Sequence, residues 1–283
     1  MIKLCYNTNG LRSMPLFNAL DAVKEHGFEG VELSLHGSHL HPFNANADEI
    51  KSIKTKLEKT GLFPACIATG CDNLLSDVRF EPSLINFESD GRELRIKLLD
   101  KTISIAKELG FRIVNFASGF KDARATSKES NKYLVEGISR LLERHPDIIL
   151  AIEPEPDMFI GTTTDAISLI DTIRHPNFKL NLDIGHVYCC EETILENIEK
   201  SIPYTVHTHI EDIKNHIHHH QIPGDGDIDF HKVLKLFVEA GYNGYISVEL
   251  YHHADVWQDA LSRSHRELTK VLADLHLAEK STV

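Results

Sequence analysis

The feature that most constrains the fold of this chain is a repeated junction between a helical pattern and a short apolar run. The junction occurs at Gly27, Gly61, Gly110 and Gly241, in the segments HGFEGVEL, TGLFPACI, LGFRIVNF and AGYNGYISVEL. Glycine directly after a helix adopts a left-handed conformation without the steric cost of a Cβ atom, and the chain then enters a strand. Four such junctions predict alternating helices and strands, which is the pattern of a parallel sheet.

The apolar runs along the chain predict eight strands separated by helical patterns. Strands are expected at residues 2–7, 30–35, 63–69, 112–117, 148–153, 179–183, 205–210 and 245–250. Helices are expected at residues 15–26, 47–59, 90–109, 128–144, 163–174, 192–201, 229–240 and 256–277. Eight such units in 283 residues match an α/β fold of the (β/α)8 TIM-barrel type. No change in composition divides the chain, so we expect a single domain over residues 1–283. The longer insertion at residues 70–89, between the third and fourth predicted strands, is expected to be a lid over the site.

Composition limits the partners that we expect for this protein. The 42 acidic residues outnumber the 30 lysines and arginines, which gives a net charge of −12 and argues against nucleic-acid binding. Five cysteines without a CxxC pair favour a reducing compartment. The chain shows neither a signal-peptide pattern nor an apolar run of membrane-spanning length. We therefore expect a cytoplasmic protein without a membrane partner.

Acids and imidazoles stand at the ends of four consecutive predicted strands. These residues are Glu153, Asp183, His209 and Glu249. Because the loops that follow the strands build the active face of a barrel, we expect the four side chains to converge. Three converging carboxylates repel one another unless a cation lies among them. This set of oxygen and nitrogen donors suits Mn²⁺, Mg²⁺, Co²⁺ or Zn²⁺. One acid after an apolar run is more often a solvated strand end, but four on successive strands predict a metal site.

Several motifs of the chain resemble those of the xylose isomerase-like TIM-barrel superfamily. They are EPEP after the fifth predicted strand, LDIGH after the sixth, HTHIED after the seventh, PGDGDIDF, and VEL on the eighth. The superfamily includes sugar-phosphate isomerases and epimerases, ketose 3-epimerases, inosose dehydratases and the endonuclease IV type of apurinic-site nuclease. The order of elements matches along the whole chain, and the motifs are densest between residues 148 and 251. The resemblance implies a divalent-metal-dependent enzyme that acts on a small carbohydrate.

The resemblance also implies roles for the residues at the strand ends. The implied metal ligands are Glu153, Asp183, His209 and Glu249. His209 is chosen over His207 because the family pattern places an acid three residues after the ligand, and Asp212 stands there. Glu153 and Glu249 would also be the catalytic acid and base, one removing a proton next to a carbonyl and the other returning one to the opposite face of an enediolate. Manganese is the expected ion, with zinc, cobalt and magnesium as alternatives.

A histidine-rich segment after the seventh strand leaves two interpretations open. His186 matches the last position of the D-x-G-H motif, which contacts substrate in epimerase-like members of the superfamily. In the nuclease branch the same position binds a further metal with two residues that match His218 and His220. Either His186, His218 and His220 hold a second cation, or His186 binds substrate while the segment around His218 is a solvated loop.

Other substrate contacts are expected where the chain departs from the ketose 3-epimerases. That branch has a second glutamate where Phe159 stands here and an arginine where Asn215 stands. Glu155 and Lys214 are the nearby residues that would replace them. Two further substrate-binding candidates, Glu32 and His36, lie on the second predicted strand and at its end.

Three classes of function follow from these motifs. The first is a sugar, sugar-phosphate or polyol isomerase or epimerase, with a dehydratase or lyase of an inosose-like substrate as the alternative within the same chemistry. The second is a multi-metal phosphoesterase of the endonuclease IV type, which the acidic charge disfavours. The third is a non-catalytic barrel that binds a metabolite. Members of the superfamily are commonly homo-oligomers, so self-association is also expected.

Overall fold

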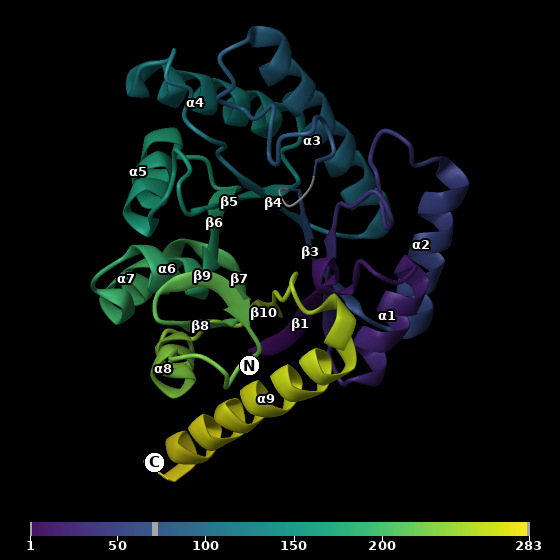
Figure 1. Cartoon of the computed structure of the whole chain (residues 1–283), viewed down its shortest axis with the longest axis vertical. Coiled ribbons are helices and arrows are strands. Elements are labelled where there is room, and N and C mark those ends of the chain that lie inside the picture. The colour runs from purple at the N-terminus through teal and green to yellow at the C-terminus, as the bar shows by residue number, and fades with distance from the viewer. Residues whose placement is uncertain (1, 70–72, 282–283) are drawn as a thin grey trace.

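The computed structural model describes residues 2–69 and 73–281 of the chain, and its centre is a closed barrel of parallel strands (Figure 1). Going round the barrel, the order of strands is β1, β10, β7, β6, β5, β4, β3 and β2. The strands are β1 (Lys3–Asn7), β2 (Gly30–Ser34), β3 (Phe63–Ala68), β4 (Ile113–Ala117), β5 (Ile149–Glu153), β6 (Phe178–Asp183), β7 (Thr205–Ile210) and β10 (Tyr245–Val248). The predicted TIM-barrel fold is therefore confirmed.

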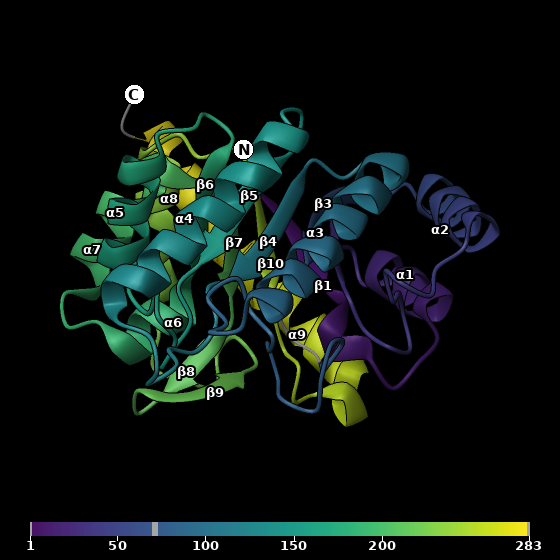
Figure 2. The same cartoon turned by 90° about the horizontal axis from the view of Figure 1, so that it is seen from above.

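Helices surround the strands on all sides, as Figure 1 shows in projection and Figure 2 shows from above. They are α1 (Leu16–Glu25), α2 (Ala47–Thr60), α3 (Ser89–Leu109), α4 (Ser127–Arg144), α5 (Thr163–Ile173), α6 (Ile184–Cys190), α7 (Ile194–Ser201), α8 (Phe230–Glu239) and α9 (Trp257–Ser281). Their apolar faces and the strands share one continuous buried core. No helix in the described part of the chain combines the length and apolarity that crossing a bilayer requires.

The glycine junctions have the conformation that the sequence predicts. Gly61 caps α2 with φ 66° and Gly110 caps α3 with φ 90°. Each glycine N–H also bonds to a carbonyl of the helix's last turn, so the helix stops there and the chain turns back toward the barrel. Gly27 and Gly241 likewise have positive φ angles, of 90° and 68°.

The sixth unit of the barrel contains two helices where one was expected at residues 192–201. The additional helix, α6, begins directly after β6. The Asp183 side chain causes this early start, because its Oδ1 accepts the backbone N–H of His186 at 2.7 Å and so caps the helix. The cap places His186 in the first turn of α6, beside the end of the strand that carries Asp183.

The histidine-rich segment forms a hairpin rather than the solvated loop that its composition favours. Strands β8 (Asp212–Lys214) and β9 (Ile217–Gln221) pair antiparallel. Asn215 and His216 connect them with φ angles of 54° and 57°, as a tight two-residue hairpin turn requires. In Figure 2 the hairpin lies at the end of the barrel away from the N-terminus. Asp212 supports it by accepting the backbone N–H groups of Gly224 and Ile228.

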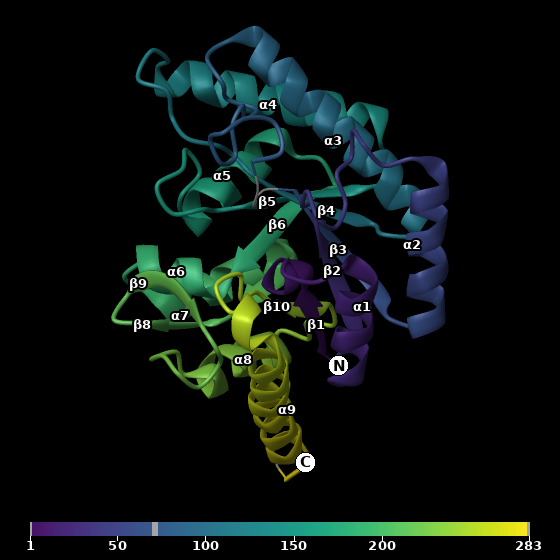
Figure 3. The ribbon, with the colours of Figure 1, turned by 45° about the vertical axis from the view of Figure 1, so that its right-hand side comes forward.

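The long C-terminal helix starts beside α1 and then runs past the barrel, as Figure 3 shows. The ring of Trp257, its first residue, lies 5.9 Å from the ring of His26. His265 packs edge-on against Phe28 at 5.2 Å. The insertion expected as a lid at residues 70–89 follows β3, and its residues 70–72 lie outside the described part.

Candidate active site

The four residues predicted as metal ligands lie at the ends of β5, β6, β7 and β10, which are neighbours in the barrel. His209 Nδ1 is 2.8 Å from Glu153 Oε1 and 3.6 Å from both Asp183 Oδ2 and Glu249 Oε2. One donor atom from each residue falls within 4.8 Å of all the others. All four side chains are buried. The structure therefore brings the four predicted residues together around one point.

Asparagine side chains hold the two glutamates of this group. Asn115 donates to Glu153 Oε2 at 3.0 Å, while Asn7 and Asn9 donate to Glu249 Oε1 at 3.0 and 2.8 Å. In each glutamate one oxygen is thus fixed by an amide, and the other faces His209. We did not predict the roles of Asn9 and Asn115. The available signal was weak: Asn115 is a polar residue inside an apolar strand.

Glu32 orients the histidine of the group. It accepts hydrogen bonds from the Nε2 atoms of His209 and His207, at 2.9 and 3.0 Å. Burial opposes its ionisation, but the two histidines outweigh burial and hold the pKa of Glu32 well below its usual value. A carboxylate on Nε2 leaves Nδ1 of His209 directed at the other three ligands, as in many metal sites. Glu32 was expected to contact substrate, whereas both of its oxygens are engaged beneath the site and it is fully buried.

The charge of this group fits a cation. Asp183 Oδ2 is buried and accepts no hydrogen bond from any described residue. Burial raises the pKa of Glu249 to about 8 and that of Glu155 to about 7, and neighbouring carboxylates add to both shifts. Such shifts mean that the protein alone supplies too little positive charge for its acids. A divalent ion among three carboxylates and one imidazole would supply that charge, and these donors suit it.

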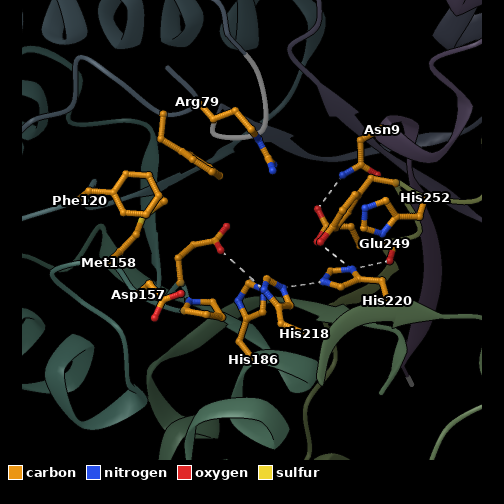
Figure 4. Close-up of a pocket in the computed structure, with 14 residues that line it drawn as sticks. Asn9, Arg79, Phe120, Asp157, Met158, His186, His218, His220, Glu249 and His252 are labelled. Atoms are coloured by element: carbon orange, nitrogen blue, oxygen red, sulfur yellow. Dashed lines mark hydrogen bonds and ion pairs between the residues drawn. The ribbon is translucent and has the colours of Figure 1, made fainter. Parts of the chain in front are cut away.

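His186, His218 and His220 form a second group next to the first. His186 Nδ1 lies 2.9 Å from the Pro154 carbonyl oxygen, and His220 Nδ1 lies 2.9 Å from that of Glu249. Because a carbonyl only accepts, both Nδ1 atoms carry a proton, and each Nε2 is the ring nitrogen that could bind a metal. His220 Nε2 lies 3.2 Å from His218 Nε2 (Figure 4). Backbone-anchored imidazoles with converging Nε2 atoms are typical of metal ligands.

Asp183 lies between the two groups. Its Oδ2 is 3.6 Å from His186 Nε2 as well as 3.6 Å from His209 Nδ1. Burial opposes protonation of His186, but Asp183 and Glu155 outweigh it and raise the pKa of His186 to about 9. Glu155 Oε2 also lies 3.8 Å from His186 Nε2, so this expected substrate contact faces the second group.

A cavity of about 340 Å³ borders Glu249 of the first group and all three histidines of the second (Figure 4). This volume suits a small ligand such as a sugar. The cavity is lined by Asn9, Arg79, Phe80, Phe120, Glu155, Pro156, Asp157, Met158, His186, His218, His220, Glu249, Tyr251 and His252. Two expected substrate contacts, His36 and Lys214, are not among the described residues of this lining. His36 Nδ1 instead accepts the N–H of Ser38, and Lys214 lies exposed at the end of β8.

Glu211 is a buried acid of this region that the sequence analysis missed. Neither of its oxygens has a hydrogen-bond partner among the described residues. Burial, assisted by the charges of Asp183 and Glu249, raises its pKa well above the usual value. It fits only because Gly185 lacks a side chain, since a Cβ there would lie 1.7 Å from Glu211 Oε1. Its spacing was an available signal, because it stands two residues after His209 and so on the same face of the chain.

The fold and these groups define a TIM barrel with a candidate metal centre at the carboxyl ends of its strands. The chain belongs to the xylose isomerase-like TIM barrel family, whose model matches residues 20–270. L-ribulose-5-phosphate 3-epimerase UlaE of Escherichia coli K12 is 22% identical over 237 residues, which cover 82% of this chain and 81% of the relative.

Two solved structures show the same fold. A D-tagatose 3-epimerase-like protein has a TM-score of 0.81 at 19% identity, with 98% of this chain and 99% of that chain covered. The IOLI protein, crystallised with a binding zinc atom, has a TM-score of 0.80 at 18% identity, with coverages of 96% and 99%.

Proposed function

We propose that this protein is a divalent-metal-dependent isomerase or epimerase of a sugar, sugar phosphate or polyol-derived ketose. The names of its relatives support this class: UlaE is an epimerase of a ketose phosphate, and one structural neighbour is called D-tagatose 3-epimerase-like. The size of the cavity and the net charge of −12 also favour a small molecule over nucleic acid. The whole chain, residues 1–283, would act as one barrel domain.

The observation that carries this proposal is the matched arrangement of Glu153 and Glu249. The two glutamates come from β5 and β10, on either side of the strands that carry Asp183 and His209. Each has one oxygen held by asparagine and one that faces the centre of the group. Two carboxylates so placed can remove a proton from one face of a substrate carbon and return one to the other face. The reaction would pass through an enediolate of the sugar.

Glu153, Asp183, His209 and Glu249 would hold the catalytic cation. When bound, the cation would acidify the C–H bond beside the substrate carbonyl and stabilise the negative charge that develops. Glu32 would keep the His209 ring in place through its bond to Nε2. The buried position of the four ligands would exclude water from the site.

Proton exchange with solvent tests this function directly. The Mn²⁺-loaded protein would be incubated in D₂O with a panel of ketoses and ketose phosphates, and NMR would follow deuterium at the carbon beside the carbonyl. Exchange accompanied by a new epimer or aldose is the expected result. Exchange accompanied by loss of water from an inosose-like substrate would identify the dehydratase alternative. Absence of exchange across the panel, with metal bound, would contradict both.

The group of His186, His218 and His220 favours a second candidate function, that of a multi-metal phosphoesterase of the endonuclease IV type. A group of three imidazoles beside a carboxylate-rich site is the arrangement that such chemistry uses. Cleavage of DNA that contains an abasic site would support this function. We favour the epimerase, because β4 carries Asn115 hydrogen-bonded to Glu153 where the nuclease branch supplies a histidine near this strand's end.

We also propose that His186, His218 and His220 hold a second cation. Wild-type protein is therefore expected to bind two ions per chain, and His218→Ala is expected to bind one. The reason is geometric, since two imidazole ligands alone leave an ion weakly held. Metal content after dialysis against Zn²⁺ or Mn²⁺, measured by mass spectrometry, gives the count. His219→Ala is the matched control, because His219 is exposed, stacks on His252 and should leave two ions bound. A single ion in wild-type protein would contradict the second site.

A further inference from the structure

Arg79 is a basic residue in a cavity rich in acids. The described residues that line the cavity include Glu155, Asp157 and Glu249 but no other arginine or lysine. Within the described part of the chain, no carboxylate lies in ion-pair contact with the Arg79 guanidinium, whose carbon is 5.2 Å from the ring centre of Phe80. Figure 4 shows Arg79 reaching toward the cavity from the side opposite His186 and His218.

The lack of a carboxylate beside the Arg79 guanidinium in the described part of the chain is informative. In a chain with a net charge of −12, an arginine has many acids within reach, and exposed arginines elsewhere in this protein pair with them. The planar guanidinium matches the oxygen pairs of phosphate and carboxylate groups. An arginine that faces a cavity and has no carboxylate partner among the described residues is available for an anion that enters with a ligand.

The backbone turn beside Arg79 is held in a fixed conformation by hydrogen bonds. Phe80, which also lines the cavity, has a φ angle of 63°, an unfavourable conformation for a bulky side chain. The buried Arg95 of α3 holds the turn, because its Nη2 donates to the carbonyl of Phe80 at 2.5 Å and its Nε to that of Pro82 at 2.8 Å. Strained backbone that a buried group keeps in place is often found at ligand sites. The turn thus presents Arg79 and Phe80 together over the cavity.

We propose that the substrate carries an anionic group, a phosphate ester or a carboxylate, and that Arg79 binds it. This inference rests on the proposed function, because it places the reacting carbons at Glu153 and Glu249 and the anion at Arg79, across the cavity from His186 and His218. The substrate class would then be an anionic ketose rather than a neutral one. Arg79 would act in substrate binding and not in proton transfer.

Substrate comparison with Arg79→Ala tests the inference. Activity would be measured on a ketopentose 5-phosphate, on the same ketopentose without phosphate, and on a ketose with a terminal carboxylate. Wild-type protein is expected to prefer one of the anionic ketoses, and which one distinguishes phosphate from carboxylate. Arg79→Ala should lower kcat/KM for that substrate by about 10- to 100-fold, mainly through KM, as loss of a charged hydrogen-bonding pair predicts. Activity on the neutral ketose should change by less than about threefold.

The matched control is Lys121→Ala. Lys121 follows Phe120 of the cavity lining, but its Nζ atom bonds to Ser127 Oγ at 2.7 Å and the residue does not line the cavity. This variant removes one positive charge from the same end of the barrel and should leave all three substrates unaffected. Equal losses in Arg79→Ala and Lys121→Ala would show a general effect of charge and overturn the inference. A preference of the wild type for the neutral ketose, or a loss found with Lys214→Gln instead, would also overturn it.

A binding measurement separates this inference from the proposed function. Calorimetric titration of the metal-loaded protein with inorganic phosphate should show binding to wild type that is at least tenfold weaker in Arg79→Ala. If no ketose in the panel exchanges a proton, the proposed function fails, but this difference would still support an anion site at Arg79. Equal phosphate affinity in the two proteins would overturn the anion site even if a ketose is epimerised.

Discussion

Replacing Glu153 or Glu249 by glutamine is expected to reduce the interconversion of epimers at least 100-fold in either variant. Each substitution removes a carboxylate that must accept or return a proton, and general acid–base groups typically contribute about 10²- to 10⁴-fold. The amide also lacks the charge that a cation at His209 and Asp183 requires. The measurement is epimer formation by NMR at a metal concentration that saturates each variant.

Exchange with solvent deuterium refines this prediction. If one glutamate serves each face of the substrate, Glu153→Gln and Glu249→Gln should lose proton exchange from opposite epimers. Glu192→Gln is the control, since Glu192 is an exposed acid beyond α6 that lies outside the cavity lining. It should match wild type. Variants of Glu153 and Glu249 that retain wild-type rates would contradict the assignment of both roles.

Binding of a divalent ion is expected to raise the midpoint of thermal unfolding strongly. At a metal concentration 1,000 times the dissociation constant, binding to the folded state alone stabilises it by about 4 kcal/mol. For a chain of roughly this size, that corresponds to about 8–16 °C. The physical source is the neutralisation of Glu153, Asp183 and Glu249, which are buried close together. Thermal unfolding followed by circular dichroism, with Mn²⁺ and with a chelator, measures the shift.

His209→Ala should abolish most of this shift, because His209 Nδ1 lies at the centre of the ligand group. His216→Ala should keep it. His216 is an exposed histidine whose ring stacks on Tyr188 and which belongs to neither donor group. A similar metal-induced shift in wild type and His209→Ala would show that the stabilising ion binds elsewhere.

The barrel was predictable because its signals are local. A glycine such as Gly110 ends a helix through its own backbone conformation, and the apolar run after it has the length of a strand. The second helix of the sixth unit was not predictable from such patterns. It depends on the Asp183 side chain turning back to the N–H of His186, and a strand-end acid can do this or face solvent with the same local sequence.

The strand-end ligands were predictable for a different reason. In a barrel, the carboxyl ends of all strands meet at one face, so Glu153 and Glu249 could be placed together without knowing any side-chain conformation. Arg79 and Glu211 could not be placed in this way. Arg79 lies in an irregular turn held by Arg95 of a later helix, and Glu211 depends on space left by Gly185 in another element.

By itself, the sequence determined the barrel and the four residues that converge at its carboxyl end, because both follow from strand order and position along each strand. Tertiary structure alone decided where the imidazoles of the histidine-rich segment lie. His218 and His220 approach His186 only because the segment folds into a hairpin, and the carbonyl of Glu249 sets the direction of the His220 ring. These contacts join residues far apart in the chain, and such contacts leave no periodic pattern in the sequence. The physical difference is between backbone geometry, which is local, and side-chain environment, which the whole fold creates.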